Sequence, residues 1–192
     1  MKLKSKFDKL KNRNTLGEVR KMEENNHVIA YGQVEMNHSC QTLNSPYEYH
    51  KLAKDFYDNA IGFYELCKVA APTLYPVSMA LHTNACLTCE LFLKSLLLAE
   101  EFDFYHKMDR SENRHNLYDL YNHLSEEGRN WIKRNTCPEN ERDFDIELKN
   151  IGNGFEVIRY IAECRGMMVD VDFLYTLMRS LAGISKYIVE QL

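Results

Sequence analysis

The sequence has little glycine and proline and contains no long uncharged apolar run. Only 8 Gly and 4 Pro occur among 192 residues, so turns are few, which favours long helices over many short strands. No segment approaches the roughly 18 apolar residues of a transmembrane helix, and the basic start MKLKSKFDKLKNR lacks the apolar part of a secretory signal. We therefore expect a cytoplasmic protein without a membrane-embedded part.

Common motifs of catalysis and cofactor binding are also missing. There is no GxGxxG or P-loop, no HExxH, no GxSxG and no EF-hand spacing. Cys86 and Cys89 form a CxxC, but no second pair completes a zinc site. Their apolar neighbours indicate small core residues within a helix. The sequence therefore predicts neither a metal nor a cofactor.

Charge is distributed unevenly along the chain. The net charge is −4, yet residues 1–21 hold eight Lys or Arg against two acidic residues. This segment has a charge of +6, and the remainder carries −10. Such a basic segment is either a solvated terminus or a contact for nucleic acid. We expect residues 1–46 to form a poorly ordered or extended arm and residues 47–192 to form the folded domain.

From Tyr47 onward, apolar residues recur at steps of three and four, which is the spacing of helices with one buried face. The pattern predicts helices over about 47–71, 77–100, 116–135, 144–162 and 170–192, the first ended by Pro72 and Pro76. These segments predict an all-α, up-and-down bundle of four to five long helices. Gly152 and Gly154 interrupt the fourth segment, so we expect a kink or a close approach there, and a place where two subunits could meet.

Three short motifs stand out in this helical part. Glu90 and Lys94 lie in CELFLKSLLL, His115 begins HNLYDLYNHL, and Arg159-Tyr160 lie in FEVIRYIAE. Across about residues 47–192 the chain thereby resembles the HEPN superfamily (higher eukaryotes and prokaryotes nucleotide-binding domain). Those domains carry an E-x-x-x-K-x-L-L helix, an H-[DN]-L-x-x-L helix start and an R-Y helix.

The resemblance implies a homodimer, or a complex with a nucleotidyltransferase-like partner. Many members are endoribonucleases of defence or toxin–antitoxin systems that use R-x4-6-H in a late helix, whereas others only bind. Here Cys164, not a histidine, follows Arg159, and the last histidine is His123. The resemblance therefore predicts a non-catalytic module that binds a nucleotide, RNA or a partner protein. The alternatives are a metal-independent ribonuclease using Arg159 or the pair Arg110 and His115, and a structural interaction protein without a ligand.

The candidate ligand-binding residues are polar side chains within these apolar helices. Arginine suits a phosphate, and tyrosine can stack on a base. Each candidate also has a structural interpretation, such as an internal ion pair, a helix buttress or a hydrogen bond across the core. The candidates are Asn84, Glu90, Lys94, His115, Arg159 and Tyr160.

Overall fold

The computed structural model describes residues 43–74, 78–108, 114–137, 141–159 and 170–192. All of them belong to one unit that begins at Cys40. The predicted arm therefore lies outside the described residues except for 43–46, and Arg110 and Tyr160 lie outside them as well.

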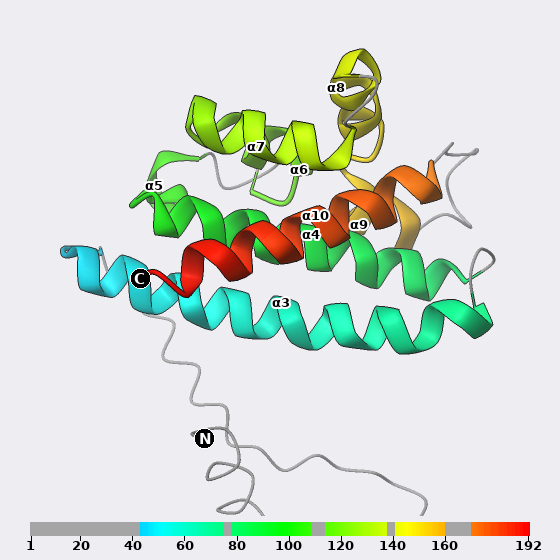
Figure 1. Cartoon of the computed structure of the whole chain (residues 1–192), viewed down its shortest axis with the longest axis horizontal. Helices are drawn as coiled ribbons and strands as arrows, with labels where there is room; N and C mark the ends of the chain where they lie inside the picture. Colours follow the sequence, from blue (N-terminus) through cyan, green and yellow to red (C-terminus); the bar gives the residue numbers. More distant parts are fainter. Residues whose placement is uncertain (1–42, 75–77, 109–113, 138–140, 160–169) are drawn as a thin grey trace, which may run out of the picture. The chain divides into compact units, whose positions relative to one another are not determined.

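The described part of the chain is entirely helical, which confirms the predicted all-α bundle (Figure 1). Within the described ranges no helix is both long and apolar enough to cross a bilayer. The helices are α3 (Pro46–Leu74), α4 (Met79–Ala99), α5 (Phe104–Lys107), α6 (Leu117–Asn122), α7 (Glu126–Thr136), α8 (Glu141–Asn150), α9 (Gly154–Arg159) and α10 (Val171–Val189).

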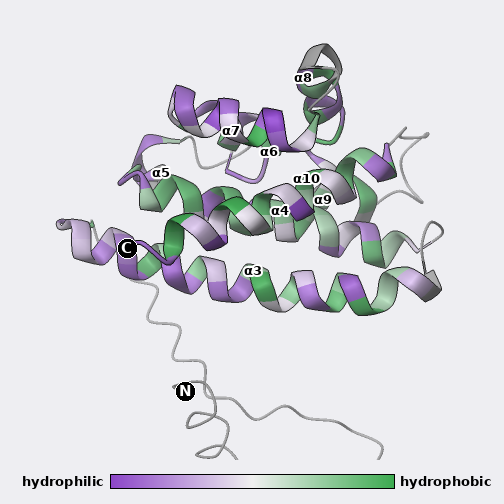
Figure 2. Cartoon of the chain, in the orientation of Figure 1, coloured by the Kyte–Doolittle hydropathy of each residue, from purple (hydrophilic) through white to green (hydrophobic). Residues whose placement is uncertain are grey.

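Helix α4 is the centre of the bundle, because α3, α6, α9 and α10 all pack against it. Its apolar character on nearly every side is visible in Figure 2, where α4 is mostly green. Small residues of α3, namely Ala53, Ala60 and Cys67, are fully buried. Beside the first of them, the Ser95 hydroxyl of α4 donates a hydrogen bond of 2.7 Å to the Ala53 carbonyl. The α3–α4 pair thus forms the base on which the shorter helices rest.

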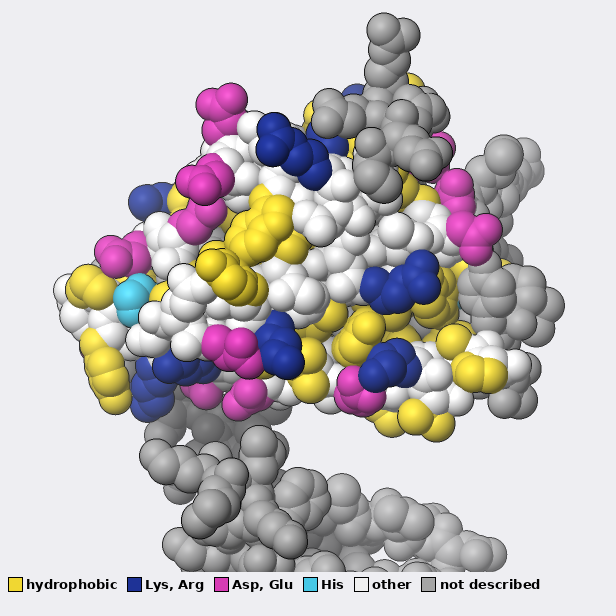
Figure 3. All heavy atoms as spheres, in the orientation of Figure 1, with side chains coloured by type: hydrophobic (Ala, Val, Ile, Leu, Met, Phe, Trp, Pro, Cys, Tyr) yellow, Lys and Arg dark blue, Asp and Glu magenta, His cyan; other side chains and the backbone are white. Residues whose placement is uncertain are grey.

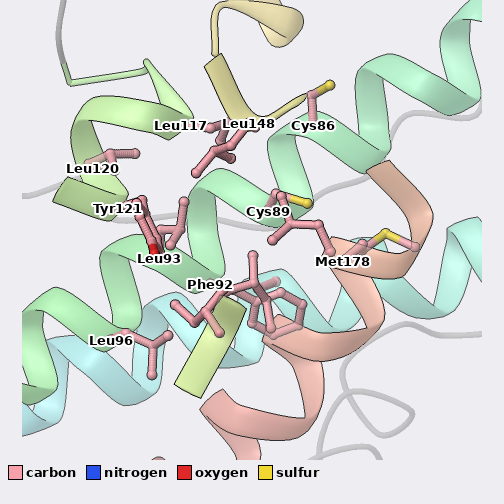
Figure 4. Packing of buried hydrophobic residues seen from close by; sticks show 14 of the residues in the cluster. Cys86, Cys89, Phe92, Leu93, Leu96, Leu117, Leu120, Tyr121, Leu148 and Met178 are labelled. Carbon is pink, nitrogen blue, oxygen red and sulfur yellow. The ribbon is translucent and has the colours of Figure 1, made fainter. Parts of the chain in front are cut away.

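The shorter helices complete the core over the other side of α4. Leu117, Leu120 and Tyr121 of α6 and Leu148 of α8 point toward Leu93 and Cys89 of α4 (Figure 4). Phe144 of α8 contacts the rings of both Tyr121 and Phe173, with centroids 5.2 and 5.7 Å apart. The core is therefore continuous from α4 through α6 and α8 to α10.

Three predicted helix boundaries were wrong. The first helix was expected to end at Pro72 and Pro76, and it continues through Pro72 to Leu74. A proline this close to the end removes only one backbone donor from the last turn. The predicted helix over 116–135 is two helices, because Ser125 starts α7 by accepting a hydrogen bond from the Gly128 N–H at 3.1 Å. The predicted helix over 144–162 breaks at residues 151–153, between α8 and α9.

The two glycines at this break approach other residues of the same chain. A Cβ on Gly154 would lie 2.7 Å from the Cys86 sulfur, and one on Gly152 would lie 2.9 Å from the Asn116 side-chain oxygen. Both predicted consequences, a kink and a close approach, are confirmed. Both glycines are buried within the chain, so the expectation that they offer a surface to a second subunit was wrong.

Candidate functional site

Glu90 and Lys94 form a buried ion pair on the central helix. They are one turn apart on α4, and their side chains are only 3% and 8% exposed. The Lys94 ammonium donates a hydrogen bond of 2.6 Å to Glu90 Oε1. The acidic residue precedes the basic one, which is the more favourable order on a helix. Two charges at this depth stabilise one another only because they are in contact.

His115 reaches the same carboxylate from the segment that leads into α6. Its Nδ1 lies 2.8 Å from Glu90 Oε1, while about half of the side chain (52%) is exposed. The imidazole therefore connects a buried carboxylate to the surface. Since the carboxylate engages Nδ1, the other ring nitrogen is available for an external group.

The local chain geometry keeps His115 in this position. Asn116 begins α6, and its Oδ1 accepts from the N–H groups of Tyr118 (2.9 Å) and Asp119 (3.1 Å). Its Nδ2 donates to Asn153 Oδ1 at 2.8 Å, and the Leu117 N–H donates to the Gly152 carbonyl at 2.8 Å. Three side-chain hydrogen bonds and one backbone hydrogen bond thus hold the residues next to His115 in place.

One oxygen of the buried carboxylate has no hydrogen-bond partner. Oε1 of Glu90 serves both Lys94 and His115, whereas Oε2 is buried and unpaired within the described residues. A buried acceptor left without a donor costs about 1–3 kcal/mol. A donor supplied by a ligand or by a bound water would remove this cost.

An apolar row accompanies the polar site on α4. Leu87 and Leu91 are one turn apart and half-buried. They precede Glu90 and Lys94 by three residues each, so the two rows lie side by side on the helix. Phe63 of α3 is also half-buried. This combination places a partly exposed apolar surface next to a charged, hydrogen-bonding one.

The structure brings together three of the six candidate ligand-binding residues, namely Glu90, Lys94 and His115. Asn84 is half-buried on α4, where its backbone carbonyl accepts from the Thr88 hydroxyl at 2.6 Å. None of the contacts that join the other three involves Asn84. Arg159 ends α9, but its side chain lies outside the described residues, as do Tyr160 and Arg110.

The sequence did not indicate that Asn153 supports the site, or that Gly152 makes room for the Asn116 side chain. Asn153 binds the Asn116 side chain, and Gly152 leaves room for it. The signal was the Gly-Asn-Gly sequence at 152–154, in which an asparagine between two glycines is typical of a turn rather than a helix. The periodic apolar spacing around it concealed that signal.

The cysteines provide no reactive or metal-binding centre in the described part of the chain. Burial, together with the nearby Glu90 charge, raises the pKa of the Cys86 thiol to about 12. Burial also raises the pKa of Cys89 well above its usual value. No group of three or more metal-ligating side chains occurs among the described residues.

No known protein family, curated protein or solved structure matches this chain.

Proposed function

We propose that this chain is a HEPN-like, non-catalytic binding module that holds a nucleotide or a short stretch of RNA at Glu90, Lys94 and His115. The supporting observation is the shared oxygen of Glu90, which lies 2.6 Å from the Lys94 ammonium and 2.8 Å from His115 Nδ1. Two of the three motifs that carry the resemblance to HEPN domains thus contribute residues to one contact, Glu90 with Lys94 from the first and His115 from the second.

The chemistry of the site suits a nucleotide in two respects. The half-exposed His115 can donate a hydrogen bond to a phosphate or a base, while the buried Glu90 carboxylate holds its ring through Nδ1. The adjacent Leu87 and Leu91 give the flat face of a base an apolar surface to cover. A defence or toxin–antitoxin system is the setting that the resemblance suggests.

A second candidate function is ribonuclease activity, and one contact favours it. Glu90 orients His115 through Nδ1, an arrangement that leaves the other nitrogen able to give or take a proton. In this case Arg110 or Arg159 would supply the positive charge near the phosphate. Incubating the protein with RNA in EDTA tests this. Cleavage that disappears in His115→Ala would replace the binding proposal with the enzymatic one.

The partner we propose is a second copy of the chain or a nucleotidyltransferase-like protein. The half-buried Phe63 of α3 and the half-buried Leu87 and Leu91 of α4 leave part of their apolar surface for such a partner to cover. Light scattering at tens of micromolar distinguishes a dimer from a monomer. A clean monomer would leave only the heterologous partner.

The binding proposal is tested by titrating ATP, GTP and a short fluorescent single-stranded RNA. We expect Glu90→Gln and His115→Ala to weaken binding by about tenfold or more, the range of a lost charge-assisted hydrogen bond. His123→Ala is the matched control, because His123 is exposed at the other end of α6, where its Nδ1 lies 2.8 Å from the Asp119 carbonyl and its ring packs against Phe102. Equal binding by all three variants, or no binding of any probe at millimolar concentration, would overturn the proposal.

A further inference from the structure

Trp131, the single tryptophan of the chain, separates two hollows on the surface of α7. Its ring also meets the ring of Tyr187 of α10 edge to face, with centroids 5.3 Å apart, and Tyr187 is 55% exposed. In Figure 3, apolar side chains in yellow lie on this face of the molecule between acidic groups in magenta and basic groups in dark blue. We name the two hollows and Trp131 together the Trp131 groove.

The first hollow is a small apolar pocket between α4, α7 and α10. Its volume is about 150 Å³, and its walls include Leu96, Ile184, Ile188 and Trp131. An apolar cavity of about this size accommodates a group such as a benzene ring. The pocket therefore fits one leucine or phenylalanine side chain.

The second hollow is polar and more open, with a volume of about 550 Å³. Glu126 and Glu127 lie at its start, Asn130 and Trp131 in the middle, and Arg134 at its end. Neither glutamate forms an ion pair within the described residues, and both are exposed. Arg134 follows Glu127 by two turns of helix, which is about 10 Å. At that distance its positive charge does not neutralise the negative charges of the two glutamates.

We propose that the Trp131 groove binds a basic peptide segment that inserts one leucine or phenylalanine into the apolar pocket. Lysine or arginine side chains of the segment lie against Glu126 and Glu127, and against the face of Trp131. A carboxylate of the segment lies near Arg134. An apolar anchor beside complementary charges is the usual way in which a short peptide is recognised in a groove.

The charge of the groove distinguishes this ligand from a nucleic acid. Two carboxylates at the entrance repel phosphates, whose contacts supply most of the affinity for nucleic acids. The groove also shares no residue with the Glu90–Lys94–His115 site, so failure of one proposal leaves the other intact.

The experiment uses Trp131 as its own reporter, because intrinsic fluorescence comes from this tryptophan and from no other. The probe is a lysine-rich synthetic peptide with one central leucine, added to the full chain. We expect the peptide to change the emission in a saturable way. The Glu126→Lys/Glu127→Lys variant should bind the peptide about three- to tenfold more weakly, because it loses exposed charge pairs with the peptide. Ala99→Leu, which fills the apolar pocket, should weaken binding as well.

Three controls make the outcome decisive. Asp55→Lys/Asp58→Lys changes the net charge equally at exposed positions of α3 and should leave binding unchanged. A peptide with alanine in place of leucine should bind more weakly, and single-stranded RNA should not change the emission. An alanine peptide that binds equally, an α3 variant that weakens binding as much, or saturable quenching by RNA would each overturn the proposal.

Discussion

Gly154 lies directly against Cys86, so that a Cβ at position 154 would be only 2.7 Å from the cysteine sulfur. Both residues are buried. The contact sets how closely α9 approaches α4, and therefore where the turn at 151–153 places Gly152 and Asn153. These two residues in turn hold Asn116, next to His115.

The first prediction concerns this contact. Gly154→Ala should lower the free energy of unfolding by about 1–3 kcal/mol, the usual cost of overpacking a core. Gly183→Ala is the control, because nothing lies within 4 Å of a Cβ there. That change should raise stability by about 0.5–1 kcal/mol, since alanine favours the helix. Urea unfolding of both variants measures the difference, and a Gly154→Ala protein as stable as the native one would contradict the contact.

The bundle itself could be predicted from the sequence. Apolar residues recur every three or four positions along α3, α4 and α10, and only a helix accounts for that spacing over such lengths. The sequence also indicated a helix that starts near residue 116 and the motif that contains Glu90 and Lys94, both of which depend on residues close in sequence. The break at 123–125 was missed, and the one at 151–153 was expected only as a kink within a single helix. The apolar spacing continues through them, while their causes lie elsewhere in the chain, at Glu100 and Asn116.

Glu100 illustrates why such breaks escape sequence analysis. Its carboxylate, at the end of α4, accepts from the Ser125 N–H at 2.7 Å and from the Ser125 hydroxyl at 2.6 Å. A Cβ on Gly128 would lie 2.9 Å from the same carboxylate. These contacts join residues 25 positions apart, so no local pattern reveals them. Glu90 and His115 are equally distant in sequence, and neither the sequence pattern nor the resemblance predicted their contact.

The second prediction concerns the buried ion pair. Lys94→Met should lower the free energy of unfolding by about 3–5 kcal/mol, because it leaves the buried carboxylate of Glu90 without its cation. In the double variant Glu90→Leu/Lys94→Met much of this loss should be recovered, since no charge then remains buried. Thermal unfolding of the two variants gives the comparison. A double variant less stable than Lys94→Met would show that the carboxylate is stabilised by other groups.

The third prediction concerns stability at alkaline pH. In the folded protein the pKa of Cys86 is raised from 9.0 to about 12 by burial. An unfolded chain ionises this thiol above its ordinary pKa, whereas the folded chain keeps it protonated, so the folded state loses stability as pH rises above about 9. Below that pH the thiol is protonated in both states and contributes nothing. Cys86→Ala should therefore unfold with a flatter dependence on alkaline pH than the native chain, measured in urea.

Reactivity of the thiols gives the fourth prediction. Cys86 and Cys89 are fully buried and their pKa values are raised, so iodoacetamide should leave both unmodified in the folded chain at mildly alkaline pH. The partly exposed Cys137 serves as the internal control and should react. Peptide mass spectrometry reads each site separately, and unfolding in urea should make all of them reactive. Modification of Cys86 in the native protein would mean that α9 leaves α4 frequently.

The last prediction concerns Asn116, which both caps α6 and binds Asn153. Asn116→Ala should lower the free energy of unfolding by about 1–2 kcal/mol, because two N–H groups at the helix start lose their acceptor. Asn116→Asp keeps that acceptor, and the amide of Asn153 can turn to donate to it, so this variant should retain most of the stability. If Asn116 acts only as a cap, Ser125→Ala, which removes the equivalent cap from α7, should have a similar effect on stability and none on ligand binding. Because Asn116 also fixes the segment next to His115, we expect Asn116→Ala to weaken nucleotide binding as well. If Asn116→Ala and Ser125→Ala bind the nucleotide equally well, the contact of Asn116 with the turn at 151–153 does not support the binding site.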